Sequence, residues 1–292
     1  MGTFTARHVD IREEGKGLQV KEQHLDIPCI GRIMSWCNEF LLISDDIRKE
    51  SLYVFNLVTK KGSYLPQCNA SCVGHSHYAR KCGVVLSFDG FKGIYKVVHL
   101  FMGPPIQCHI HTLRKDIVSR VSSKWKKMEI PYMNEGQHYS GDPVSIQGRY
   151  FYWDIYSSNH LVFMDIVSEK IFQISLPGRG LRRRCEYSLF VMGGFLALFD
   201  GVSWDKAEIW ILKDLKMMKW EKLHIWSFRV SPGTCRYPVS GVISKRHIIL
   251  KSRVDNGMYS YDVKYELVKE LDIHVESDDE SCVVHSSAPS YI

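Results

Sequence analysis

A hairpin that is apolar on both faces, and that recurs along the chain, constrains the fold more than any other feature. Residues 51–66, SLYVFNLVTKKGSYLP, have the pattern of a strand, a polar turn and a second short strand. Side chains alternate between the two faces of a strand. Leu52 and Val54 would point to one face, and the equally apolar Tyr53 and Phe55 would point to the other. We therefore expect both faces of this hairpin to be buried.

Hairpins of the same kind return at residues 108–131, 160–177, 207–225 and 258–273. Ahead of each hairpin lies another pair of apolar runs with turn residues between them, so the repeating unit has four antiparallel strands. Successive units end about 49 residues apart on average. Four-stranded units at this spacing are typical of a β-propeller, in which each blade packs against two neighbours and both faces of its strands are buried.

A turn signal strengthens this interpretation. Asn56, Asp165 and Asp262 each stand where the third strand of a unit ends. An Asn or Asp side-chain oxygen in that place accepts a hydrogen bond from the backbone N–H two residues further on and starts a turn. We expect these three residues to begin the turns between the third and fourth strands.

The number of strand endings sets the expected number of blades. Six last strands end between Ile27 and Ile273, but only five units are complete. We therefore predict an all-β, six-bladed propeller of four-stranded antiparallel blades, with residues 1–292 forming a single domain. One blade would be closed by strands from both ends of the chain: FTARHVDI and GLQVKEQHLDIP near the N-terminus and CVVHSSAPSYI, residues 282–292, at the C-terminus.

Composition narrows the compartment and the classes of partner. The chain has nine cysteines and no visible secretory signal, which favours reduced thiols and a cytoplasmic or nuclear location, or both. The longest apolar run, residues 187–199, is too short to cross a membrane, so no membrane partner is expected. A formal charge of +6 is modest, and we do not expect nucleic acid as the main partner.

Two clusters offer alternatives to a simple binding role. One holds Cys and His residues, which are zinc ligands, although their spacing matches no standard zinc motif. Its members are Cys68, Cys72, His75, His77 and Cys82, followed downstream by Cys108, His109 and His111. This cluster keeps open a metal-binding or enzymatic propeller. The simpler interpretation is a loop and strand in which the thiols pack as small hydrophobes, and we expect neither a metal nor a cofactor.

The second cluster is the basic run GRGLRRRC at residues 178–185. Arg182, Arg183 and Arg184 could bind phosphate or carboxylate groups, which keeps open an RNA- or phosphopeptide-binding role beside that of a solvated loop. No nucleophilic serine turn, phosphate-binding glycine loop or metalloprotease helix is present, so we do not expect an enzyme.

The ordered set of strand motifs resembles one known family. CNEFLLISDD, SLYVFNLVTKKGSYLP, YKVVHLF and SSKWKKMEIP occur in that order, followed by GRYFYWDI, HLVFMDIVSEKIFQISLP, GGFLALFDG, AEIWILKD and KWEKL. The set is similar to the plant F-box-associated domain from about residue 20 to the C-terminus. This resemblance implies a propeller that captures a target protein for a Skp–cullin–F-box ubiquitin ligase, which leads to ubiquitination and proteasomal degradation.

The same resemblance bears on partners. In the family, an N-terminal F-box binds the Skp adaptor, whereas this chain starts at MGTFTARHVDI, already in propeller strands. The expected partner is therefore a target protein, with the Skp-type adaptor and the cullin joining only where an F-box precedes this chain.

Propeller geometry indicates where a target would bind. The loops between the second and third strands share a face with the loops between blades, and that face commonly receives the ligand. Aromatic and arginine side chains are the usual binding hot spots. Those that the pattern places on this rim are Tyr132, Tyr139, Arg182, Arg183, Trp204, Trp226, Phe228, Arg236 and Tyr237.

Overall fold

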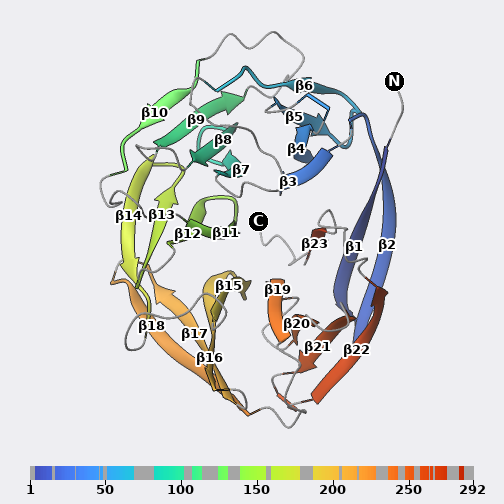
Figure 1. Ribbon diagram of the computed structural model, residues 1–292, viewed down its shortest axis with the longest axis vertical. Helices are drawn as coiled ribbons and strands as arrows, with labels where there is room; N and C mark the ends of the chain where they lie inside the picture. The colour runs from blue at the N-terminus through green and yellow to red at the C-terminus, as the bar shows by residue number, and fades with distance from the viewer. Residues whose placement is uncertain are drawn as a thin grey trace. The chain divides into compact units, whose positions relative to one another are not determined.

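The computed structural model describes residues 4–14, 17–29, 31–45, 47–48, 51–68, 82–101, 107–113, 124–130, 139–155, 159–177, 187–203, 206–215, 217–227, 236–242, 247–252, 257–262, 264–265, 267–274 and 283–285. The elements in these ranges are all β-strands, labelled in Figure 1. None of the described residues belongs to a helix that is long and apolar enough to cross a membrane.

Twenty of the strands form five four-stranded antiparallel sheets, which we call blades 1 to 5. Blade 1 holds β3 (Gly31–Cys37), β4 (Phe40–Asp45), β5 (Ser51–Asn56) and β6 (Gly62–Tyr64); blade 2 holds β7 (Cys82–Asp89), β8 (Ile94–Phe101), β9 (Gln107–Leu113) and β10 (Lys126–Met128); blade 3 holds β11 (Tyr139–Ile146), β12 (Tyr150–Ile155), β13 (His160–Asp165) and β14 (Lys170–Ser175). Blade 4 holds β15 (Tyr187–Met192), β16 (Phe195–Ser203), β17 (Lys206–Asp214) and β18 (Lys219–Ser227), and blade 5 holds β19 (Arg236–Val242), β20 (His247–Ser252), β21 (Gly257–Asp262) and β22 (Leu267–His274).

The chain divides into two compact units, each of which shows propeller packing. Blades 1 to 3 lie in the first unit, Met1–Phe4 with Ile27–Leu176, and blades 4 and 5 lie in the second, Thr5–Asp26 with Pro177–Ile292. In the first unit β7 contacts both β3 and β11, and in the second β19 contacts both β15 and β23 (Val283–His285). Side-by-side contacts between edge strands of successive sheets are typical of a propeller, so the all-β propeller class is confirmed.

The expected six four-stranded blades are wrong, because the described strands form five. The strands from the two ends of the chain make a sheet of three, in the order β2 (Gly17–Ile27), β1 (Phe4–Glu14), β23. In this sheet β1 and β23 are parallel, with Val9 opposite Val284. The error has a physical source: a spacing between strand endings counts sheets, but it cannot count the strands that lie inside each sheet.

The cores explain why the strands are apolar on both faces. A cluster between blades 1 and 2 joins Leu52 and Val54, 4% and 0% exposed, to Tyr95 and Val97 of blade 2. On the other face of the same hairpin Phe55 is buried, and a second cluster between blades 2 and 3 continues the pattern. In the second unit, a cluster containing Phe190 and Tyr261 joins blades 4 and 5.

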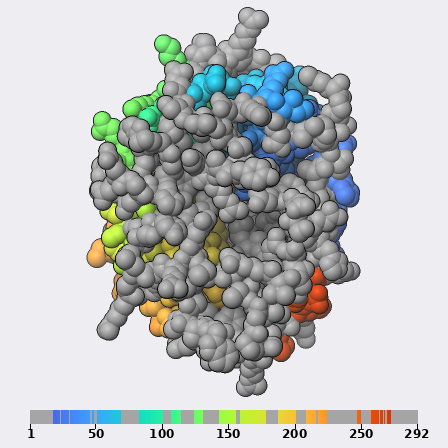
Figure 2. Space-filling model, viewed as in Figure 1, coloured from blue at the N-terminus to red at the C-terminus, as the bar shows by residue number. Residues whose placement is uncertain are grey.

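Described side chains of blade 1 reach the surface of the molecule, where Figure 2 shows them in blue and cyan.

The predicted turns are confirmed in all three places. The Oδ1 atom of Asn56 accepts from the N–H of Val58 at 2.9 Å, and Asp165 Oδ1 accepts from Val167 at 3.1 Å. Asp262 Oδ1 accepts from the N–H of Lys264 at 2.9 Å. These turns, with those between first and second strands, make up what we call the turn edge of a blade. The opposite edge, where the second strand joins the third, is called the loop edge.

Candidate binding edge

The residues selected from the sequence as rim contacts fall largely outside the described part of the chain. Tyr132, Arg182, Arg183, Trp204 and Phe228 lie outside the described residues, as does Arg184. Tyr139, Trp226, Arg236 and Tyr237 lie in described strands, and only their backbone is described. That these nine residues contact a target stays a prediction.

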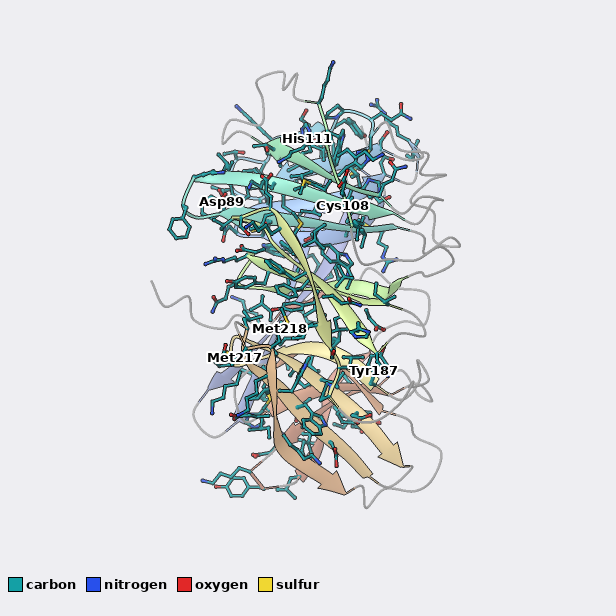
Figure 3. All side chains as sticks on the ribbon, turned by 90° about the vertical axis from the view of Figure 1, so that its left-hand side faces the viewer. Asp89, Cys108, His111, Tyr187, Met217 and Met218 are labelled. Carbon is teal, nitrogen blue, oxygen red and sulfur yellow. The ribbon has the colours of Figure 1, made fainter. Side chains whose placement is uncertain are left out.

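The strand register places those four backbone positions at the loop edges of their own blades. Tyr139 pairs with Ile155, the last residue of β12, and Arg236 pairs with Ser252, the last residue of β20. Trp226 pairs with Ala207, near the start of β17. In Figure 3, Asp89 marks the turn edge of blade 2, and Cys108 lies towards the loop edge of the same blade.

The described part of the loop edge of blade 1, residues 45, 47 and 48 with the end of β6, is centred on Asp45. Asp45 ends β4 and is only 4% exposed. Its Oδ1 atom accepts from the N–H groups of Ile47 at 2.8 Å and Arg48 at 2.9 Å. Its Oδ2 atom accepts from the hydroxyl of Tyr64 at 2.5 Å, which ties the loop after β4 to the end of β6. This carboxylate therefore fixes the start of the loop.

The start of this loop and the end of β6 together present three side chains, those of Ile47, Arg48 and Tyr64. The Ile47 side chain is 70% exposed, although it is a large aliphatic group. The Arg48 guanidinium carbon lies 4.4 Å from the centre of the Tyr64 ring, in a cation–π contact. Arginine and tyrosine are enriched among binding hot spots. We call Ile47, Arg48 and Tyr64 the blade 1 rim.

Sequence reasoning missed these three residues because the contacts that make the blade 1 rim are not local. Tyr64 lies 19 positions from Asp45, and the pairing of β4, β5 and β6 brings the two together. A local signal was available, because an Asp at the end of an apolar run often accepts hydrogen bonds from the next N–H groups.

Electrostatics at Asp45 favours the ionised form. Burial alone would raise the pKa of this carboxyl, but the hydrogen bonds from Tyr64 and from the N–H groups of Arg48 and Ile47 outweigh it and lower the pKa. Burial and the hydrogen bond to Asp45 raise the pKa of Tyr64 to about 12. Tyr64 thus remains a hydrogen-bond donor at neutral pH.

This shift predicts an acid-sensitive contribution to stability. A carboxyl group whose pKa is lower in the folded than in the unfolded state stabilises the fold at pH values above its unfolded-state pKa. That stabilisation is lost as the pH falls through the folded-state pKa. The difference in unfolding free energy between wild type and Asp45→Asn should therefore be present at pH 7 and shrink below about pH 4. Urea unfolding across this pH range measures it, and a difference that does not change with pH would contradict the assignment.

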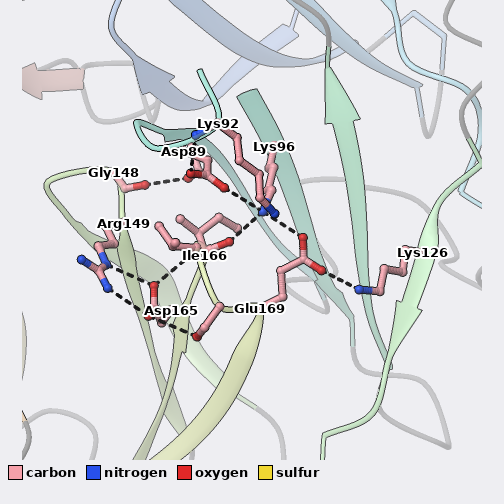
Figure 4. Close-up of polar contacts among 12 residues, drawn as sticks. Asp89, Lys92, Lys96, Lys126, Gly148, Arg149, Asp165, Ile166 and Glu169 are labelled. Carbon is pink, nitrogen blue, oxygen red and sulfur yellow. Dashed lines mark hydrogen bonds and ion pairs between the residues drawn. The ribbon is translucent and has the colours of Figure 1, made fainter. Parts of the chain in front are cut away.

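A second polar cluster lies at the turn edges of blades 2 and 3 (Figure 4). The Lys96 ammonium lies 3.2 Å from Asp89 Oδ2 and 2.8 Å from Glu169 Oε1, and it donates to the carbonyl of Ile166 at 2.8 Å. The outer oxygen of Glu169 accepts from Lys126 at 2.5 Å. Burial acts to raise the pKa of Glu169, but the bonds from Lys126 and Lys96 outweigh it and lower that pKa. Because β8 is joined in this way to the turn between β13 and β14, the cluster holds two blades together.

The Cys and His residues are only partly described. Cys72, His75 and His77 lie outside the described residues, and Cys82 is described only as the first backbone position of β7. Cys68 is described, and its Sγ atom lies 3.4 Å from His109 Nδ1. Within the described ranges, no group of three or more His, Cys, Asp or Glu side chains is arranged to hold a metal ion.

Comparisons with known proteins agree with the fold. Residues 4–289 match the family model described as the F-box associated beta propeller domain. A protein of Arabidopsis thaliana that is named as an F-box protein is 30% identical over 177 residues, which cover 59% of this chain and 44% of that protein. The match thus spans less than half the length of this curated relative.

Two solved structures are similar in backbone. The β-propeller domain of Cps50 (Swd1) from Myceliophteria thermophila has a TM-score of 0.52 at 12% identity, covering 94% of this chain and 90% of that domain. A chain of a nidogen–laminin complex has a TM-score of 0.50 at 12% identity, covering 94% of each chain. Likeness at this level of identity concerns the fold alone.

Proposed function

Because this chain belongs to the family of F-box associated β-propeller domains, we propose that it recognises a target protein for a Skp–cullin–F-box ubiquitin ligase. The propeller binds the target, and the ligase then ubiquitinates it for proteasomal degradation. The chain itself performs no chemistry in this proposal. The compartment is the cytoplasm, the nucleus or both, which imaging of a fluorescent fusion would check.

The blade 1 rim is the observation that carries this proposal. It is held in place by Asp45, so little conformational entropy is lost when a partner covers it. It offers an exposed aliphatic group, a stacked guanidinium and an aromatic ring within one blade. Arginine and tyrosine are among the residues that most often dominate the free energy of protein–protein binding.

We predict that Arg48→Ala weakens target binding by about 2 kcal/mol, or roughly 30-fold in Kd. Targets are first identified by crosslinking and mass spectrometry with the wild-type chain, and affinities for the purified target are then measured by calorimetry. Val58→Asp is the control, because Val58 is 78% exposed in the same blade but lies at its turn edge. The affinity of the Val58→Asp variant for the target should stay within about threefold of the wild-type affinity. Equal affinities for the wild type and Arg48→Ala would remove the blade 1 rim from the binding site.

Adaptor binding is a separate step of the proposal. In this scheme an F-box in the same polypeptide binds the Skp-type adaptor, and the adaptor joins the cullin. Mapping the 5′ end of the transcript tests it: an in-frame F-box upstream of Met1 supports ligase assembly through this chain. A transcript that starts at Met1 would leave a propeller that binds its target without delivering it.

A further inference from the structure

The contact between Cys68 and His109 joins residues that are far apart in sequence. Cys68 lies four positions after the end of β6, and His109 is the third residue of β9 in blade 2. The Sγ atom of Cys68 is 3.4 Å from Nδ1 of His109, within hydrogen-bonding distance for sulfur. Figure 3 labels Cys108 and His111 on the same strand, one on each side of His109 in sequence.

Gln107 determines which ring nitrogen of His109 carries the proton. The Nε2 atom of His109 lies 3.2 Å from Oε1 of Gln107, and an amide oxygen can only accept. With the Gln107 amide in this orientation Nε2 is the donor, and in the neutral ring Nδ1 then carries the lone pair. It follows that the Cys68 thiol donates its proton to Nδ1, so a proton acceptor is already aligned with the thiol.

The surroundings keep His109 neutral and leave Cys68 within reach. Burial, followed by the nearby His99 and Lys127, lowers the pKa of His109, so its base form predominates at neutral pH. Cys68 is partly exposed, whereas burial raises the pKa of its neighbour Cys108 to about 12. A thiol needs both access and a proton acceptor to react as a nucleophile.

We propose that Cys68 is a reactive thiol that takes part in exchange with small disulfides, with His109 as its proton acceptor and Gln107 as a positioning residue. In the exchange, the Cys68 sulfur attacks one sulfur of the disulfide as its proton moves to Nδ1 of His109. A new S–S bond forms, the original S–S bond breaks, and the departing thiolate takes the proton. The protein thiol is oxidised and the small disulfide is reduced. This proposal is independent of the function proposed above.

The first test measures the rate at which each cysteine of the intact chain reacts with 4,4′-dithiodipyridine, with sites assigned by peptide mass spectrometry. Cys68 should react at least about tenfold faster than Cys37, whose pKa is raised to about 12 by burial and by Glu39. His109→Ala should lower the Cys68 rate at least about tenfold while leaving the Cys37 rate unchanged. Cys108 should stay unreactive in this variant, which shows that blade 2 remains folded.

Two further variants keep the imidazole and change only its partner. Gln107→Ala removes the hydrogen-bond acceptor for Nε2 and should slow the reaction of Cys68 with 4,4′-dithiodipyridine severalfold. Gln107→Glu keeps an acceptor, and Cys68 should react in this variant at about the wild-type rate. These variants decide the matter if His109→Ala does not fold. Equal Cys68 rates in the wild type and both Gln107 variants would overturn the proposal. Protection of Cys68 by one equivalent of Zn²⁺ would also overturn it, because the two side chains would then be metal ligands.

Discussion

Replacing Lys96 with methionine should lower the free energy of unfolding by about 3–5 kcal/mol, because it leaves a buried carboxylate without its counter-ion. The same change at Lys126 should cost less than about 1 kcal/mol. Both lysines bind the same Glu169 carboxylate, one at each oxygen. The two changes therefore differ mainly in how far the ion pair is removed from water.

The exposures of the side chains determine this difference. Lys96 and Asp89 are 1% and 0% exposed, whereas the Lys126 side chain is 62% exposed. The Asp89 carboxylate is not reached by water. Without Lys96, its one described side-chain hydrogen bond would be the one from the N–H of Lys92 at 3.2 Å. Water can replace Lys126 at the outer oxygen of Glu169, so little is lost there.

Urea unfolding at pH 7 of the wild type and both variants provides the measurement. A double variant, Lys96→Met with Asp89→Asn, should recover part of the loss, because it removes the uncompensated charge. Equal losses for the two single variants would show that Lys96 is not the counter-ion of a buried pair. A loss without recovery in the double variant would point to packing of the Lys96 side chain as the cause.

Much of the fold follows from local patterns in the sequence. Leu52 and Val54 predict an interface between blades because alternation and hydrophobicity are properties of adjacent residues. Asn56, Asp165 and Asp262 predict turns because their hydrogen bonds reach only two residues along the chain. Strands from both ends of the chain share one sheet, as predicted, but that sheet has three described strands and not four. Its strand number depends on pairing between β1 and β23 at opposite ends of the chain, which local patterns do not show.

The candidate sites were less accessible to sequence reasoning because they depend on contacts between distant residues. Asp45 meets Tyr64 through strand pairing, and Cys68 meets His109 across 41 positions. Lys96 lies inside the apolar strand IYKVVHLF, where periodicity indicates burial but cannot show that Glu169, on the next blade, supplies its charge. The rim prediction rested on loop position and on aromatic and arginine residue types, and it did not use the anchoring by Asp45 that orders Ile47 and Arg48.

Replacing Trp153 with alanine should also destabilise the fold by about 3–5 kcal/mol, because it removes the largest fully buried side chain of the described residues. Trp153 lies on β12 in the cluster that joins blades 2 and 3. Its indole approaches β7, where a Cβ atom added to Gly83 would lie 3.2 Å from Nε1. Removal of the Trp153 indole therefore leaves a cavity at an interface between two sheets, and neither sheet can fill this cavity alone.

Phe91→Ala is the matched control in the same unit, because the Phe91 side chain is 82% exposed in the turn between β7 and β8. Its removal should change the unfolding free energy by less than about 0.5 kcal/mol. Urea unfolding followed by circular dichroism compares the two variants without relying on tryptophan fluorescence. If Trp153→Ala costs no more than Phe91→Ala, the two blades do not share a core. The strands that are apolar on both faces would then need an explanation other than packing between blades, because burial of both faces requires a neighbouring sheet on each side.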